Sequence, residues 1–246
     1  MIQKPSQDPR EVFIDAAIRF LSGRIAPGRA GVRAKGGTLT RGDLPRAESL
    51  GIRMVADLAG RNPATLLFHF PDRESLMAAI AARAFELLVH LLEHEPAAIA
   101  DRCRIVGVTQ RYVTWGIDNP GLFTAMYDPS LARGVELVQL ADDTRPEDRF
   151  AVAGEKSEIG RKRARAFSDL LQAKQRALTC FVDAFEADRA GGVVRDVDAS
   201  SASHGMTALA DGLVWQWITE RQGTPVMMRR HADAVIVMMV KGLRLG

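Results

Sequence analysis

The sequence predicts an all-α protein, and three observations support this fold class. Apolar residues recur at helical spacing along most of the chain, whereas alternating runs rich in valine, threonine and aromatic residues are scarce. No Asn-Gly or Asp-Gly turn joins two such runs, so the usual sign of a β-hairpin is missing. Glycine, proline and capping residues divide the chain into segments of helix length.

The N-terminal third is predicted to contain four helices separated by strong breakers. The first spans 11–25 and is ended by Pro27 and Gly28, and a basic, Gly-rich insertion at about 26–50 follows, in which 44–50 form one or two helical turns. A short helix over 52–59 is closed by Gly60. Asn62 caps the next helix, which has Pro63 at its first position and runs to about residue 69. Asp72 caps a long helix that starts at residue 73 and stops near residue 96.

The rest of the chain is predicted to form a larger helical body. A polar, charged stretch over 141–160 is expected to be a loop. The expected helices cover 97–117, 122–127, 161–189, 201–221 and 226–243.

Composition excludes several classes of protein. The 246 residues are 47% hydrophobic and 26% charged, as in a globular protein, and they suffice to bury a core. Cys103 and Cys180 cannot make a disulfide framework and are expected to be reduced, buried residues of a cytoplasmic protein. The N-terminus lacks the apolar stretch of a signal peptide, and the longest apolar run, Ala234–Val240, is too short to cross a bilayer. We therefore expect neither secretion nor a membrane partner.

Positive charge is concentrated at the N-terminal end of the chain. Residues 1–80 contain 12 Lys and Arg against 8 Asp and Glu, whereas residues 81–246 contain 21 against 22. Residues 1–80 therefore carry +4 and residues 81–246 carry −1, so the positive charge lies in the region that contains the short helices.

The stretch from Gly51 to Leu76 predicts a helix-turn-helix. Two short helices joined by a tight glycine turn form this motif, and its second helix lies in the major groove of DNA. Small or apolar residues of the first helix face the core, as do Leu66 and Phe70 of the second. The residues left pointing outward or lying at helix ends are Arg61, Asn62, Ala64, Thr65, Phe68 and His69.

The same stretch resembles the DNA-binding segment of TetR-family transcriptional regulators. The family pattern is matched by Ile52, Val55, Ala56, Ala59 and Gly60 in its first half and by Thr65, Leu66, His69, Phe70 and Leu76 in its second. Asp15-Ala16-Ala17 with Phe20 also resembles the family's first helix, so the resemblance covers about 60 residues. The sequence departs from the pattern in three residues and in a connection some 20 residues longer between the first two helices. Leu67 stands in place of a phosphate-binding tyrosine, Arg73 in place of a phosphate-binding lysine, and Arg61 in place of a turn valine.

The resemblance implies a homodimeric regulator, most simply a repressor released from a palindromic double-stranded DNA operator by a small apolar ligand. Arg53, Arg61, Thr65 and Arg73 would position the protein on phosphates, and Asn62, Ala64, Phe68 and His69 would lie near base edges. For His69, packing against Phe70 is an equal alternative. The head would cover 8–72 and the ligand-binding and dimerisation body 73–246.

Segments around Trp115 and around His204-Gly205 resemble TetR effector domains, the second of them the Trp-His-Gly subclass. The last two predicted helices would then form a four-helix bundle between two copies. Aromatic and methionine side chains of this body are expected to form core or dimer interface, and a subset would line a ligand pocket. The candidates are Trp115, Phe123, Met126, Tyr127, Phe181, Phe185, Met206 and Trp215.

Other chemistry finds little support. His90 and His94 have metal-ligand spacing without a third ligand nearby, so a solvated helix end is favoured and no metal or other cofactor is predicted. The basic insertion is expected to be a solvated loop rather than a DNA arm. Arg161, Lys162, Arg163 and Arg165 are expected to form a solvated face at the start of a long helix, far from the helix-turn-helix. No catalytic motif is present, so an enzyme is not predicted. The alternatives are a protein of this fold without an inducer, and one that has lost DNA binding and acts through protein contacts.

Overall fold

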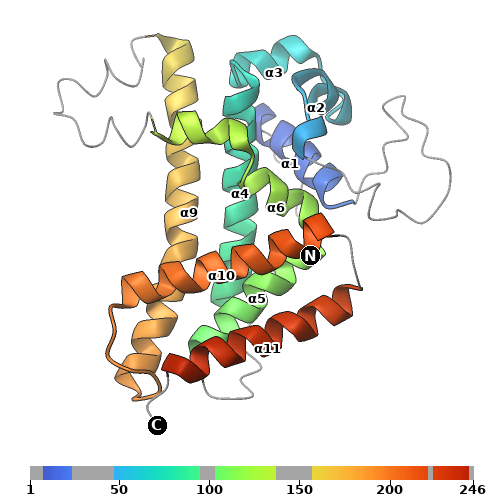
Figure 1. The fold of residues 1–246 in the computed structure, drawn as a ribbon. Helices are drawn as coiled ribbons and strands as arrows, with labels where there is room; N and C mark the ends of the chain where they lie inside the picture. The colour runs from blue at the N-terminus through green and yellow to red at the C-terminus, as the bar shows by residue number, and fades with distance from the viewer. Residues whose placement is uncertain (1–7, 24–46, 95–102, 137–156, 221–223, 244–246) are drawn as a thin grey trace. The chain divides into compact units, whose positions relative to one another are not determined.

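A computed structural model describes residues 8–23, 47–94, 103–136, 157–220 and 224–243, and every regular element in them is helical (Figure 1). By contacts the chain forms two compact units that are not continuous in sequence. The first unit combines residues 1–85 with 120–173, and the second combines 86–119 with 174–246. The long helices α4 (Arg73–His94) and α9 (Glu158–Ala190) each contribute to both units. The division into a DNA-binding head over 8–72 and a ligand-binding and dimerisation body over 73–246 remains a prediction.

The first unit gathers short helices around the N-terminal halves of α4 and α9. Its remaining elements are α1 (Pro9–Leu21), η3 (Ala47–Ser49), α2 (Ile52–Leu58), α3 (Pro63–His69), α6 (Pro120–Met126) and η4 (Pro129–Leu131). Helix α1 contacts α2, α3 and α6, and it buries Phe13, Ala17 and Phe20. Helix α1 therefore packs against both helices of the pair α2 and α3 and against α6 within this unit.

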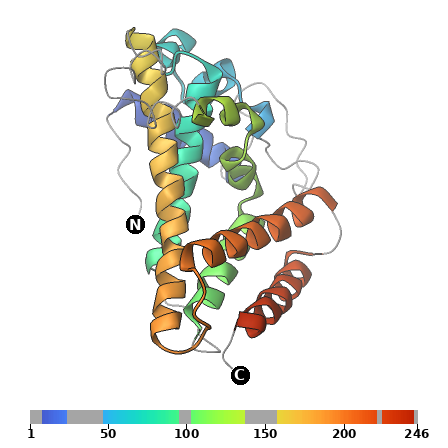
Figure 2. The same cartoon turned by 60° about the vertical axis from the view of Figure 1, so that its left-hand side comes forward.

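The second unit is built on α5 (Arg104–Asp118), which packs against both α10 (Ala199–Glu220) and α11 (Pro225–Leu243). In Figure 2, α10 runs across α5, and α11 is seen as a separate helix beside it. Ten of the 15 residues of α5 are buried, because it is covered on more than one side. Helix α11 buries only Ala232, Ile236 and Val240, so most of its surface is exposed.

The start of α5 is fixed by a carboxylate from another helix. Cys103, at the N-cap, makes no side-chain cap. Instead Asp188 of α9, which is 2% exposed, accepts hydrogen bonds from the Arg104 and Ile105 N–H groups at 2.9 Å each and from the Cys103 thiol at 3.2 Å. A residue more than 80 positions away thus satisfies amide groups that the first turn of a helix leaves unpaired.

Helix α4 is the only helix in the described part of the chain that is long and apolar enough to cross a membrane. Its most apolar 18-residue window is 72% buried within the protein. This is the environment of a core helix, so length and composition here are weak evidence for a membrane span.

The structure confirms most of the predicted helices and corrects two boundaries. The predicted bounds of α2, α3, α4, α9, α10 and α11 hold within a few residues. The first helix ends at Leu21 rather than at residue 25, because Gly23 adopts the left-handed conformation with φ +67°. The fifth begins at Arg104 rather than at residue 97, since Cys103 is extended, while 97–102 lie outside the described residues. Most of the basic insertion and of the 141–160 loop also lies outside them.

Candidate nucleic-acid interface

The turn between α2 and α3 has the geometry that a helix-turn-helix requires. Gly60 has φ +62°, a conformation that side-chain-bearing residues rarely adopt. The Arg61 N–H donates to the Ala56 carbonyl at 2.9 Å, and the Gly60 N–H donates to that of Asp57 at 3.1 Å. On the far side of the turn, Asn62 Oδ1 accepts from the Ala64 N–H at 2.9 Å and starts α3. The glycine and asparagine signals of the sequence therefore act as predicted.

The two short helices bury one face and expose the other. Val55, Ala56, Leu66 and Phe70 are at most 1% exposed, as the sequence predicts for the core-facing side. The outer face of α3 carries Ala64, Thr65, Leu67 and Phe68, all exposed. The Phe68 side chain is 64% exposed, and Leu67 is 46% exposed. Exposure of such large apolar side chains to water costs free energy, so this face is the part of α3 best suited to contact a partner.

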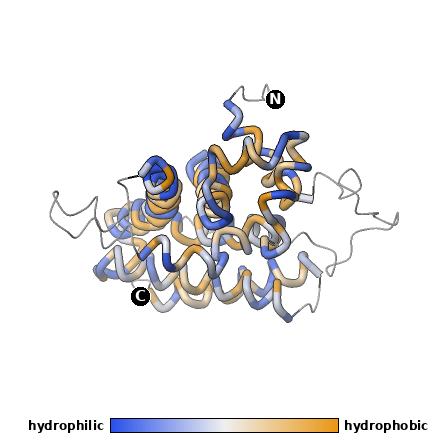
Figure 3. Tube along the Cα trace, turned by 90° about the horizontal axis from the view of Figure 1, so that it is seen from above, coloured by the Kyte–Doolittle hydropathy of each residue, from blue (hydrophilic) through white to orange (hydrophobic). Residues whose placement is uncertain are grey.

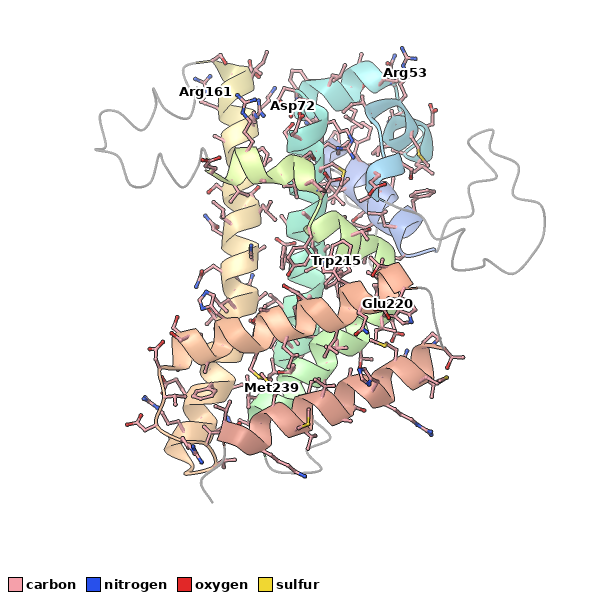
Figure 4. All side chains as sticks on the ribbon, viewed as in Figure 1. Arg53, Asp72, Arg161, Trp215, Glu220 and Met239 are labelled. Carbon is pink, nitrogen blue, oxygen red and sulfur yellow. The ribbon has the colours of Figure 1, made fainter. Side chains whose placement is uncertain are left out.

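Two arginines and the capping asparagine flank that exposed face. Arg53 of α2 and Arg61 of the turn are both exposed, and no described residue forms an ion pair with either of them. Arg53 lies at the outer end of the first unit in Figure 4. The oxygen of Asn62 is occupied by its cap, which leaves the amide nitrogen as the group able to donate outward. Guanidinium groups, a hydroxyl and an amide nitrogen are donors suited to phosphate and base-edge acceptors.

His69 and Arg73 face inward more than the other candidates do. The His69 ring lies 6.3 Å from the ring of Phe13 and 5.3 Å from that of Phe68, so it packs between α1 and the outer face. The Arg73 guanidinium donates to the carbonyls of Leu50 (3.0 Å) and Ala47 (3.3 Å) and to the side chains of Asp128 and Ser130 (3.3 Å each). These contacts favour packing for His69 and a structural role for Arg73.

The Arg73 contacts hold a buried carboxylate. Asp128 is 6% exposed, and burial raises its pKa. Hydrogen bonds from the Ser130 hydroxyl and N–H, together with the charge and hydrogen bond of Arg73, outweigh that effect and hold the pKa of Asp128 below its usual value. The network joins the first turn of α4 to the segments before α2 and after α6.

A basic group that the sequence analysis assigned to a solvated face lies beside α3. Lys162 Nζ donates to the Phe68 carbonyl at 2.7 Å and sits 3.9 Å from the centre of the Phe68 ring. Arg163 lies 3.5 Å from Asp72. Both contacts fall within the first unit. The expectation that this run lies far from α3 is therefore wrong. No local signal could have revealed a contact across 94 residues.

The eight candidate ligand residues are divided between the two units. In the first, the Phe123 ring lies 5.1 Å from that of Tyr127, which also meets Phe85 at 6.1 Å. In the second, Phe181 packs edge-on against Tyr112 at 5.6 Å. Phe123, Phe181 and Phe185 are fully buried, Met126, Met206 and Trp115 are at most 9% exposed, and Tyr127 and Trp215 are partly exposed. They contribute to the two cores, and a ligand role for a subset remains a prediction.

His90 and His94 lie on the exposed end of α4. Their rings stack with centres 4.5 Å apart, and His94 Nδ1 lies 3.0 Å from the His90 carbonyl. No group of three or more potential metal ligands occurs among the described residues.

Both cysteines are free. Cys103 is buried and Cys180 is only partly buried, so the prediction of two buried thiols holds for Cys103 alone.

Several solved structures are similar in fold to this chain over almost its full length. A protein of unknown function from Rhodococcus sp. RHA1 has a TM-score of 0.57 at 19% identity, over 99% of this chain and 100% of that one. A bacterial regulatory protein in the tetR family from Rhodococcus RHA1 has a TM-score of 0.53 at 15% identity, covering 95% and 97%. A transcriptional regulator from Saccharomonospora viridis, described as putative and solved in complex with choline, has a TM-score of 0.50 at 20% identity, covering 94% and 96%. Neither a family model nor a curated protein sequence matches this chain.

The geometry and these neighbours together define the class of protein. It is an all-α protein whose N-terminal unit carries a helix-turn-helix with an exposed second helix. Many of its structural neighbours are TetR-family transcriptional regulators, and the chain has the fold of that family.

Proposed function

We propose that the protein is a DNA-binding transcriptional regulator that acts as a homodimeric repressor. One observation carries the proposal: the outward face of α3 is exposed, is flanked by Arg53 and Arg61, and follows a turn of helix-turn-helix geometry. The fold shared with TetR-family regulators supports the same class of function. The proposal also makes the protein cytoplasmic and not an enzyme, as regulators of this kind are.

The exposed face of α3 would lie in the major groove. Thr65 and the arginines would bind phosphates on either side, and Ala64 with the Asn62 amide would approach base edges. Phe68 would contact apolar groups such as thymine methyls. Most of the affinity would come from phosphate contacts and would fall steeply as salt is added.

Dimerisation would use the exposed surfaces of α10 and α11. The exposed side of α10 carries Gly205, Ala208 and Gly212, and a Cβ added at either glycine would meet nothing within 4 Å among the described residues. Packing within the chain therefore does not require these glycines, whereas close approach of a second helix would. On α11, Met238 is 67% exposed and Met239 is 45% exposed. Figure 4 places Met239 on α11 and Trp215 on α10. Two copies packed on this surface would present two heads to a palindromic operator.

A small-molecule ligand would control the dimer by shifting its population between two conformations. The ligand weakens DNA binding only by as much as it prefers the conformation that cannot bind the operator. Helix α4 is the physical link, since its first part belongs to the unit with the helix-turn-helix and its last part to the other. A small-molecule ligand is supported by one structural neighbour, described as a putative transcriptional regulator, which was solved in complex with choline.

The decisive experiment is selection of DNA from a random pool by the purified full-length protein at two salt concentrations. We expect a palindromic consensus. The logarithm of the binding constant should fall linearly with the logarithm of the salt concentration. An Arg53→Ala/Arg61→Ala variant should bind that consensus with a shallower slope. Arg104→Ala/Lys174→Ala removes two exposed cations outside the first unit and is the matched control.

The same experiment tests the second candidate, a protein of this fold that acts through protein contacts. Its specific support is Leu67, exposed where the family pattern has a tyrosine. Recovery of no consensus at either salt concentration would refute the DNA-binding proposal and favour this one.

A further inference from the structure

The N-terminal turns of α9 carry a cluster of positive charge, which we call the α9 basic end. It consists of Arg161, Lys162, Arg163 and Arg165. With Glu158 as the only acidic residue in the same stretch, residues 158–165 carry a net charge of +3. Seen end-on in Figure 3, the near end of α9 is coloured as hydrophilic.

Two side chains of this cluster contact α3 and the turn that follows it. Lys162 binds the last turn of α3 through the Phe68 carbonyl and ring, and it pairs with Glu158 at 2.7 Å. The contact with Lys162 holds the pKa of Glu158 below its usual value. Arg163 pairs with Asp72, in the turn before α4. These contacts fix the cluster beside the exposed face of α3. Figure 4 accordingly shows Arg161, Asp72 and Arg53 at the same end of the unit.

The other two side chains point away from the core. Arg161 and Arg165 are exposed, and they are four residues apart, so they share one side of the helix. The opposite side buries Ala166, Phe167 and Leu170. No described residue forms an ion pair with Arg165 or with Arg161, although the charge of Arg161 helps to lower the pKa of Glu158. Two guanidinium groups are therefore directed outward, beside a surface proposed to meet DNA.

We propose that the α9 basic end is a second DNA-binding element, which binds the phosphate backbone next to the base pairs that α3 contacts. This inference rests on the proposed function. A helix in the major groove has a phosphate backbone on each side, and cations fixed at its end lie within the field of those phosphates. Arg161 and Arg165 supply two bidentate donors, while Lys162 and Arg163 hold them in place. The contacts carry no base specificity and lengthen the DNA segment that the dimer needs.

The test compares the wild-type protein with an Arg161→Gln/Arg165→Gln variant on two duplexes, one limited to the selected consensus and one extended by about ten base pairs on each side, roughly one helical turn. The wild type should bind the extended duplex more tightly, by about tenfold or more at moderate salt. The variant should lose this additional affinity for the extended duplex but should still select the same consensus sequence. Its salt slope should be shallower by roughly two per protomer, from about 0.9 for each phosphate contact.

An equal change of charge elsewhere provides the control. Lys174 and Arg104 are exposed and lie outside the first unit, so Lys174→Gln/Arg104→Gln should leave the flank gain and the slope unchanged. Thermal unfolding of all variants separates folding defects from binding defects. Equal losses on both duplexes with an unchanged slope would mean that the arginines are structural, and an unaltered flank gain would also overturn the inference. Either result leaves the proposed function standing, whereas absence of a consensus for the wild type refutes the proposed function itself.

Discussion

Arg73 offers the sharpest test of the structure, because the sequence and the structure assign it different roles. The family pattern places a phosphate-binding cation here, whereas the guanidinium contacts four protein groups. Arg73→Ala removes all four contacts at once. It leaves Asp128, whose side chain is 4% exposed, with the hydrogen bonds of Ser130 alone.

The cost can be bounded from these contacts. Losing one partner of a buried ion pair costs about 3–5 kcal/mol. Here the Arg73 side chain is 32% exposed and three of its four hydrogen bonds are 3.3 Å long, so water replaces part of the interaction. We therefore expect a loss of about 2–3 kcal/mol. For a chain of this size that corresponds to a fall in Tm of roughly 5–10 °C.

The effect should depend on pH in a defined direction. Burial raises the pKa of Asp128, but Ser130 and Arg73 lower it by more, so its pKa in the folded protein lies below the usual value of 3.8. The stabilisation is thus present above pH 3.8 and is lost as pH falls through the folded pKa. The Tm difference between wild type and Arg73→Ala should therefore be largest near neutral pH and shrink in acid.

Thermal unfolding followed by circular dichroism checks this, with Arg133→Ala as the exposed control. Asp128→Asn combined with Arg73→Ala should cost less than the sum of the single changes, because the two residues interact. A Tm for Arg73→Ala within about 2 °C of the control at neutral pH would refute the reasoning. A shallower salt slope of DNA binding with unchanged Tm would instead support phosphate binding by Arg73.

Three further predictions concern the other structural features. Asp188→Ala should lower the free energy of unfolding by about 1–3 kcal/mol by uncapping α5, with a smaller loss for Asp188→Asn; a denaturant curve like that of the wild type would exclude the capping role. Gly60→Ala should cost about 1 kcal/mol and weaken operator binding, since residues with a side chain rarely adopt φ +62°; an equal or higher Tm would contradict this. Met238→Glu should shift the protein toward monomer in sedimentation velocity without lowering helix content; a dimer of unchanged affinity would remove α11 from the interface.

Much of the candidate site could be predicted because its signals are local. The bounds of α2 and α3 follow from Gly60, Asn62 and Pro63, which act on backbone groups within a few residues of themselves. The exposed face of α3 follows from helical periodicity alone. The end of α1 could also be predicted from a local signal, Gly23, although Pro27 and Gly28 further along the chain are more conspicuous helix breakers.

The all-α class, the helix-turn-helix and the residues on its outer face follow from local sequence signals, because helix caps and periodicity depend on neighbours along the chain. The long-range partners became known from the tertiary structure alone. It gave Arg73 its carboxylate, supplied α5 with a cap from Asp188, and brought Lys162 to Phe68 across 94 residues. Such contacts depend on how whole helices pack, and no pattern within one segment specifies which distant side chain meets it.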